Sequence, residues 1–245
     1  MSSEWKARRF WTTTAVEPVG DGWQLRLDDR ALRTPGKLPL VLPTQALAQA
    51  VAAEWEAQQD VIAPATMPLT RAVNSAVEKV APQFAGVAGM LAEYGGTDLL
   101  CYRATHPAEL AAQQAARWDP LLGWAAGELG AGLRVVQGVM PVAQDPQALA
   151  RLRAPLDALS PWELTAVHDL VTIPGSLILG LAVLRGRLDA ATAHGLSRID
   201  DDHQAALWGR DAEADAAAAA RLEAMLVAER LLRLLCGGPD AGHNA

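Results

Sequence analysis

The first part of the chain alternates apolar and polar side chains with a period of two residues. In the segment GWQLRLDD, residues 22–29, Trp23, Leu25 and Leu27 are separated by polar residues. This spacing turns one face of a β-strand towards a core and the other towards solvent. Glycine and aspartate residues on both sides of the segment are typical of turns. The pattern therefore predicts a β-strand between two turns.

A second segment, KLPLVLP at residues 37–43, also predicts a strand. Proline cannot donate a backbone hydrogen bond to a neighbouring strand, so Pro39 restricts this strand to a sheet edge or a bulge. Two short strands with turn residues between them are typical of antiparallel pairing. We therefore expect a small antiparallel β domain over residues 8–43.

After residue 43 the apolar period lengthens to that of a helix. Thr44 is a candidate N-cap, and the apolar positions from Leu47 to Trp55 follow the i, i+3, i+4, i+7, i+8 spacing, which places Trp55 on the inward stripe. One further strand is expected at residues 132–140. Helices are expected at residues 69–80, 83–94, from 107 onward with an interruption at Asp119 and Pro120, and at 146–159, 161–171, 176–184, 189–208 and 212–236.

This order of elements predicts an α+β fold, in which a small N-terminal antiparallel β domain precedes a larger, mainly α-helical domain at residues 44–237. Residues 238–245, after a pair of glycines, are expected to form a disordered tail. No internal repeat interrupts this arrangement.

Composition and charge narrow the possible functions. The 245-residue chain has a net charge of −7, which argues against nucleic acid as a partner because phosphate contacts need clustered Lys and Arg. No apolar run approaches the ~20 residues of a membrane span. The longest, residues 173–184, is broken by Pro174, Gly175 and Gly180, which favours a buried helix. With two distant cysteines and no secretory signal segment, we expect a cytoplasmic protein.

Several residues of possible catalytic use occur in the segment GTDLLCYRATHPAEL, residues 96–110. A cysteine-dependent hydrolase that uses Cys101 and His106 is one interpretation. If residues 99–103 are extended, however, His106 would have to fold back from beyond the strand to reach Cys101. We therefore favour a packed segment in which Cys101 is buried and Arg103 pairs with Asp98 or with a carboxylate on a helix.

Other catalytic and cofactor motifs are missing from the sequence. The stretch RTPGK, which ends at Lys37, lacks the first glycine and the Ser/Thr of a phosphate-binding loop, and there is no G-x-G-x-x-G or H-E-x-x-H motif. The histidines and cysteines have no spacing typical of metal ligands. We therefore expect no cofactor and no metal site.

An acidic segment with one tryptophan, RIDDDHQAALWGRDAEAD at residues 198–215, leaves two interpretations open. In a helix, Asp200, Gln204 and Trp208 form one row, and Gly209 ends the helix. The first interpretation is a helical hairpin with a solvated acidic face and Trp208 wedged at its corner. The second is a docking surface in which the indole lies beside carboxylates, Asp211 among them.

Five longer segments resemble one protein family. They are LDDRALRTPGKLPLVLPTQALAQAVAAEW at residues 27–55, TMPLTRAVNSA at 66–76, TDLLCYR at 97–103, QQAARWDPLLGW at 113–124 and HQAALWGRDAEA at 203–214. In this order they resemble the ATP synthase assembly chaperone family. The resemblance implies a small β domain before a helical domain. It also implies transient binding of the unassembled alpha subunit of the catalytic head, which is protected from aggregation until the beta subunit replaces the chaperone.

The resemblance also implies a set of partner-binding residues. Glu213 falls on the family's functional acidic position, and Gln204, Trp208, Gly209 and Asp211 match the same motif. This sequence departs from the family at residues 200–202, where aspartates replace the usual glutamates, and at His203, where an aromatic residue is common. The resemblance implies no enzyme activity, nucleotide or metal, and we expect a bacterial monomer. A permanent structural subunit is a further alternative.

Overall fold

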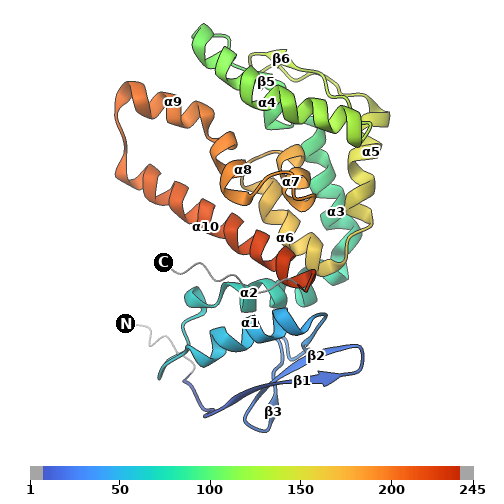
Figure 1. The fold of residues 1–245 in the computed structure, drawn as a ribbon, viewed down its shortest axis with the longest axis vertical. Coiled ribbons are helices and arrows are strands. Elements are labelled where there is room, and N and C mark those ends of the chain that lie inside the picture. Colours follow the sequence, from blue (N-terminus) through green and yellow to red (C-terminus); the bar gives the residue numbers. More distant parts are fainter. Residues whose placement is uncertain (1–7, 238–245) are drawn as a thin grey trace. The chain divides into compact units, whose positions relative to one another are not determined.

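A computed structural model describes residues 8–237 and has the predicted α+β fold, in which a small antiparallel sheet precedes a mostly helical region (Figure 1). The tail predicted at residues 238–245 lies outside the described residues. The chain divides into two compact units. The first contains residues 8–83, Pro161–Thr165 and residues 230–237, and the second contains Phe84–Ser160 and Ala166–Glu229.

The sheet of the first unit is centred on one strand. Strand β2 (Gly22–Leu27) pairs antiparallel with β1 (Thr14–Val19), β3 (Arg30–Ala31) and β4 (Val41–Leu42). The β1–β2 turn begins at Gly20, which has a φ of +55°, a conformation that glycine adopts readily. The predicted strand at residues 22–29 is therefore confirmed as the middle strand of the sheet.

Helix α1 (Gln45–Glu56) covers the sheet and contacts β1 and β2. Leu25 and Leu27 are buried, as their alternation predicted. Thr44 caps α1 as expected, because its hydroxyl accepts a hydrogen bond of 3.2 Å from the Leu47 amide. The same hydroxyl donates to the backbone oxygen of Leu234 at 2.8 Å, so a residue 190 positions further along the chain contributes to the first unit.

The second predicted strand is shorter than expected. Only Val41–Leu42 forms a ladder with β2, and Pro39 makes an isolated bridge to Arg33. The missing amide of Pro39 explains why pairing is interrupted there. The first unit continues beyond the sheet through η1 (Pro64–Thr66), α2 (Pro68–Ser75), the π-helical η2 (Ala76–Val80) and η3 (Ala81–Gln83).

A buried glutamate caps the N-terminus of α2. Glu54 of α1 accepts hydrogen bonds from the amides of Leu69 and Thr70 and from the Thr70 hydroxyl, at 2.8, 2.7 and 2.7 Å. Burial raises the pKa of Glu54, although these hydrogen bonds oppose the shift. Helices α1 and α2 thus belong to the same compact unit as the sheet, whereas the sequence placed the end of the β domain at residue 43.

The second unit is mainly helical. It contains a parallel pair of β5 (Tyr102–Arg103) with β6 (Val136–Gln137), and β6 is all that forms of the strand predicted at residues 132–140. Helices α6 and α10 each have one end in the first unit. The elements from residue 84 onward are α3 (Phe84–Glu93), η4 (Tyr94–Gly96), η5 (Leu99–Cys101), β5 (Tyr102–Arg103), α4 (Ala108–Glu128), β6 (Val136–Gln137), α5 (Pro146–Asp157), α6 (Pro161–Thr172), α7 (Leu177–Leu184), α8 (Ala190–Ser197), α9 (Ile199–Trp208) and α10 (Ala212–Leu235).

Helix α7 forms the centre of the second unit, and all its residues up to Val183 are buried. This confirms the buried helix predicted from the apolar run at residues 173–184. Gly180 allows α6 to approach closely, since a Cβ there would collide with Cγ2 of Val171. Trp118 of α4 is also fully buried, and its indole nitrogen donates to the backbone oxygen of Leu196 at 2.9 Å.

Two predicted helix boundaries were wrong. The interruption expected at Pro120 does not occur, and α4 continues to Glu128. Its residues Trp118, Leu121 and Trp124 are buried on one side. Burial of this face outweighs the one hydrogen bond that proline removes. The single helix expected at residues 189–208 is instead two, since Arg198 has φ −104° and ψ 9° and its amide bonds the oxygen of Gly195. No helix within residues 8–237 has the length and apolar character that a membrane span requires.

Candidate functional site

The cysteine that could have been a nucleophile is buried. Cys101 is 1% exposed and lies in the 3-10 turn η5, so of the residues considered as an extended segment only Tyr102 and Arg103 form a strand. Burial, and then the nearby Asp98 charge, raises the pKa of the Cys101 thiol to about 12. A thiol with this pKa stays protonated near neutral pH and is a poor nucleophile. His106 is exposed.

Asp98 explains why this segment turns instead of continuing as a strand. Its fully buried carboxylate accepts hydrogen bonds from the Leu100 amide at 3.0 Å, the Ser176 hydroxyl at 2.7 Å and the Ile178 amide at 3.0 Å. It therefore caps both η5 and the N-terminus of α7. Burial raises the pKa of Asp98 to about 6, and the hydrogen bonds hold it lower than burial alone would. These contacts make Asp98 a structural residue.

Arg103 forms the ion pair that the sequence left open between two partners. Its guanidinium lies 2.6 Å from the carboxylate of Asp119 on α4 and over the ring of Trp118, 5.0 Å from the centroid. The helix carboxylate is therefore the correct alternative, and Asp98 is not the partner. Together with the buried Cys101, this contact makes residues 98–103 a packed segment of the second unit.

A groove of about 420 Å³ lies between α9 and the first turns of α10. Figure 1 shows these two helices as arms joined by a short turn. We call this feature the α9–α10 groove. Its lining residues come from both helices and from the turn: Arg198, Asp201, Gln204, Ala205, Trp208, Gly209, Asp211, Ala214, Asp215, Ala217 and Arg221.

Trp208 is the most exposed large apolar residue of this groove, at 88%. The neighbouring Leu207 is 65% exposed. Gly209 ends α9 with a φ of +96°, and its amide bonds the oxygen of Ala205, so the last turn of α9 projects its side chains outward. The interpretation in which Trp208 is wedged at the corner of the hairpin was therefore wrong. An exposed indole beside charged residues is typical of a binding anchor.

The turn after Trp208 is held by local polar contacts. The Asp211 carboxylate caps α10 by accepting from the Ala214 amide at 2.8 Å. The Arg210 guanidinium donates twice to Asp215, at 2.9 and 3.1 Å, and this bidentate contact lowers the pKa of that carboxyl. These contacts fix the direction in which α10 leaves the turn.

The three aspartates of α9 have separate roles. Arg198 pairs with Asp201 and with Asp202, at 3.2 Å in each case. Asp200 instead accepts a 2.6 Å hydrogen bond from the buried Gln114 of α4. Asp200 therefore anchors α9 to α4, whereas Asp201 and Asp202 lie on the solvent side.

The structure brings four of the five expected site residues together. Gln204, Trp208, Gly209 and Asp211 all line the α9–α10 groove, whereas Glu213 is exposed on the first turn of α10 outside this lining. Within residues 8–237, Glu213 makes no ion pair. Sequence reasoning missed Arg198 and Arg221 as lining residues. Position 198 was detectable, because it begins the acidic segment.

The described part of the chain offers no cluster of His, Cys, Asp and Glu suited to a metal ion. The charged groups of the α9–α10 groove are aspartates and arginines, several of which pair with one another, and Gln204 adds an uncharged polar group. This arrangement provides an apolar anchor with a charged rim, which is the usual composition of a protein-binding surface.

The fold and this groove define an α+β protein with an exposed recognition surface. A family model described as ATP12 chaperone protein matches residues 8–126. The chain is 62% identical to Atp12 from Paracoccus denitrificans, whose crystal structure aligns with a TM-score of 0.92 over 95% of this chain and 100% of that chain. The chain therefore belongs to the ATP12 chaperone family, whose members are ATP synthase assembly chaperones.

Other relatives agree with this assignment. An aspartate-to-lysine mutant of the Paracoccus protein is 61% identical and aligns with a TM-score of 0.92 over 95% of this chain and all of that one. A proposed chaperone from Agrobacterium tumefaciens is 39% identical, with a TM-score of 0.88 over 92% of this chain and 85% of that one. The mitochondrial protein atp12 of Schizosaccharomyces pombe is 26% identical over 82% of this chain and 74% of its own length.

Proposed function

We propose that this protein binds the unassembled alpha subunit of the F-type ATP synthase catalytic head and prevents its aggregation until the beta subunit replaces the chaperone. Binding is transient, and the protein acts as a monomer in the bacterial cytoplasm without catalysing a reaction. Membership of the ATP12 chaperone family supports this role in assembly. Cys101 is buried and its thiol has a raised pKa, so it is poorly suited to act as the nucleophile of a cysteine-dependent hydrolase.

The observation that carries the proposal is the exposed indole of Trp208 in the α9–α10 groove. An orphan subunit exposes an apolar interface intended for its neighbour, and such surfaces aggregate. Trp208 supplies an apolar anchor for that interface, with Gln204, Gly209 and Asp211 beside it. Glu213 adds a negative charge that has no cation partner within residues 8–237.

The charges around Trp208 favour release as well as binding. Exposed ion pairs contribute only about 0.2–1 kcal/mol each, so a competing subunit can exchange them easily. Specificity then depends on the apolar anchor and on the positions of the carboxylates. A surface of this kind protects its partner and yields to the subunit that buries the same interface permanently.

Co-expression with an ATP synthase alpha subunit, in cells that lack the beta subunit, tests the proposal. We expect the wild-type chain to raise the soluble yield of the alpha subunit. Purified beta subunit, added afterwards to the isolated complex, should displace the chain. Equal yields with and without the chain would reject the proposed function. A permanent stoichiometric complex with the assembled enzyme would reject the transient role and favour a structural subunit.

Matched variants locate the binding surface in the same assay. Glu213→Lys should reduce rescue, whereas Glu223→Lys makes the same charge change farther along α10 and should leave it unchanged. Trp208→Ala should also reduce rescue. Met140→Ala removes another exposed apolar side chain, 77% exposed, and serves as its control. Full rescue by both Glu213→Lys and Trp208→Ala would reject the site while leaving the function in place.

A further inference from the structure

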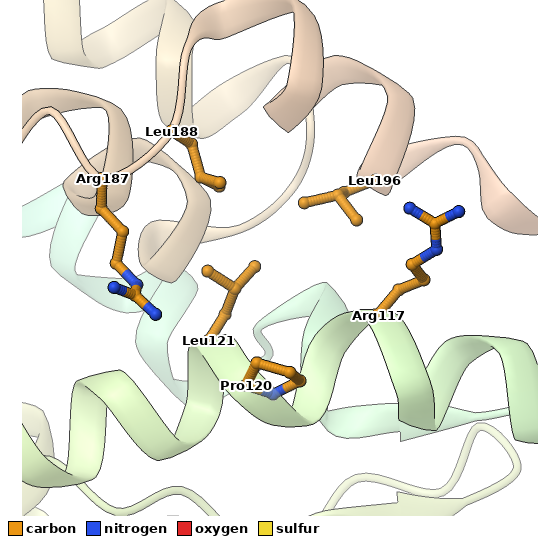
Figure 2. Close-up of a pocket in the computed structure, with 6 residues that line it drawn as sticks. All are labelled: Arg117, Pro120, Leu121, Arg187, Leu188 and Leu196. Atoms are coloured by element: carbon orange, nitrogen blue, oxygen red, sulfur yellow. The ribbon is translucent and has the colours of Figure 1, made fainter.

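A second pocket of the helical unit lies apart from the residues that line the α9–α10 groove. It encloses about 280 Å³ and is lined by residues of α4, of the connection between α7 and α8, and of α8 itself. Figure 2 shows its six lining side chains, which are Arg117, Pro120, Leu121, Arg187, Leu188 and Leu196. We call it the α4–α8 pocket.

The floor and walls of the α4–α8 pocket are apolar. Leu121 is 4% exposed, and Leu188 and Leu196 are half-buried. Ligand pockets for whole small molecules usually have volumes of ~300–1,000 Å³, so this one suits a single large apolar side chain better. The backbone oxygen of Leu196 is held by Trp118, which fixes this wall of the pocket.

Two arginines stand at opposite ends of the leucines in Figure 2. Arg117 and Arg187 are both exposed, and neither guanidinium makes a hydrogen bond or an ion pair within residues 8–237. By contrast, Arg103, Arg198 and Arg210 of the same unit all pair with aspartates. Arg117 and Arg187 differ from other exposed arginines in flanking one apolar pocket, and on a chain with a net charge of −7 this placement favours an anionic ligand.

We propose that the α4–α8 pocket binds an extended acidic–apolar–acidic segment of a protein partner. The apolar side chain enters between Leu121, Leu188 and Leu196, and one carboxylate on each side pairs with Arg117 or Arg187. Alternate residues of an extended segment point to the same side, so one segment presents all three groups together. Guanidinium groups bind carboxylates through two parallel hydrogen bonds, which favours carboxylates at both ends.

Charge complementarity distinguishes this ligand from a fatty acid. A fatty acid has one carboxylate and would leave one of the two arginines without a partner. A segment with two carboxylates satisfies both, while its apolar residue occupies the small space between them. The site requires neither Trp208 nor Glu213, so it is independent of the surface proposed for the alpha subunit.

The test uses the 245-residue chain and a fluorescent peptide, acetyl-Glu-Ala-Leu-Ala-Glu-amide with a dye on a C-terminal linker. Fluorescence anisotropy should show saturable binding. Replacing both glutamates with glutamine, or the leucine with alanine, should weaken binding about fivefold or more, because each change removes a contact worth roughly 1 kcal/mol or more. Absence of saturable binding, or equal binding of the glutamine peptide, would overturn the proposal.

Charge-reversed variants locate the peptide. The double variant Arg117→Glu, Arg187→Glu should bind about tenfold more weakly or worse, since each pair becomes repulsive. The control Arg71→Glu, Arg185→Glu has the same net charge and alters exposed arginines outside the pocket, so it should bind like the wild type. Equal weakening in both would indicate general charge attraction and overturn the site.

Two further measurements exclude effects of charge repulsion or misfolding and binding of a small amphiphile. Arg117→Gln, Arg187→Gln repeats the test without introducing repulsion, and circular dichroism confirms that each variant is folded. Octanoate is added as a competitor, and displacement of the peptide at a comparable affinity would overturn the proposal in favour of a small anionic amphiphile. None of these results depends on rescue of the alpha subunit, so failure here is distinguishable from failure of the proposed function.

Discussion

Two regions of the second unit use aspartates in opposite ways. Around Asp98, a fully buried carboxylate accepts three hydrogen bonds from groups of η5 and the start of α7. In and beside the α9–α10 groove, Asp201, Asp202 and Asp215 pair with arginines at the surface. Removing a buried acceptor leaves its donors without any hydrogen-bond partner, because water cannot reach them, and this lowers stability. Removing one member of an exposed ion pair costs little stability, because water replaces it. The buried carboxylate therefore maintains the fold, and the exposed ones are available for exchange with a partner.

The largest expected effect is that of Asp98→Ala. This change leaves the Ser176 hydroxyl and the amides of Leu100 and Ile178 buried without their acceptor. We expect the free energy of unfolding to fall by about 3 kcal/mol or more, as measured by urea denaturation. Asp201→Ala is the exposed counterpart and should change it by less than about 1 kcal/mol. Similar values for the two variants would contradict the contrast between the regions.

The pH dependence of stability should depend on the same buried carboxylate. The pKa of Asp98 rises from 3.8 to about 6 on folding. The folded state therefore binds the Asp98 proton more tightly than the unfolded chain does. The stability gained from this tighter binding is fully present below pH 3.8 and is lost as the pH rises through about 6. Two pKa units correspond to about 2–3 kcal/mol.

Unfolding measurements of the wild type and Asp98→Asn between pH 4 and 7 isolate this contribution, since the amide does not titrate in this range. We expect the stability of the wild type to fall relative to that of the variant as the pH rises. A constant difference between the two proteins across this range would show that Asp98 has the same pKa in the folded and unfolded chains.

The next largest loss of stability is expected from crowding the contact between α6 and α7 at Gly180. Gly180→Ala places a Cβ against Cγ2 of Val171 and 3.2 Å from the backbone oxygen of Leu170. We expect a loss of about 1–3 kcal/mol of stability, measured by thermal and urea unfolding. Gly123→Ala in α4 is the matched control, because beyond its chain neighbours and the nearby backbone of its own helix nothing lies within 4 Å of its new Cβ. It should be neutral or stabilise the helix by up to about 1 kcal/mol.

The smallest effect on stability is expected for Trp208→Ala. The indole is 88% exposed, so little burial is lost and the free energy of unfolding should change by less than about 0.5 kcal/mol. The same variant should reduce rescue of the alpha subunit, which separates recognition from folding. A large loss of stability would show that Trp208 is a packing residue after all.

The sequence predicted those elements whose signals are local. The alternation around Leu25, the cap at Thr44 and the apolar run that became α7 all specified their structures within a few residues. Predictions failed where distant groups decide the outcome. Pro120 stays inside α4 because of the burial of that helix's apolar face, and η5 forms because Asp98 binds residues of α7 that lie far away in the sequence.

The candidate site could be found only in part. The resemblance identified Gln204, Trp208, Gly209 and Asp211, which line one groove. The exposure of Trp208 could not be deduced, because an amphipathic pattern does not say whether a partner helix covers the last turn. The arginines of the α4–α8 pocket come from α4 and from the connection between α7 and α8, and they had no common signal in the sequence.

The bond from Thr44 to Leu234 has a consequence for synthesis on the ribosome. These residues are 190 positions apart, so the first unit lacks one of its own contacts until α10 has been translated. The second unit likewise waits for α7, since Ser176 is made 78 positions after Asp98. Each unit therefore lacks some of its native contacts while the nascent chain is still emerging. A truncated product that stops before α10 would be susceptible to proteolysis in both units, since both contain part of that helix.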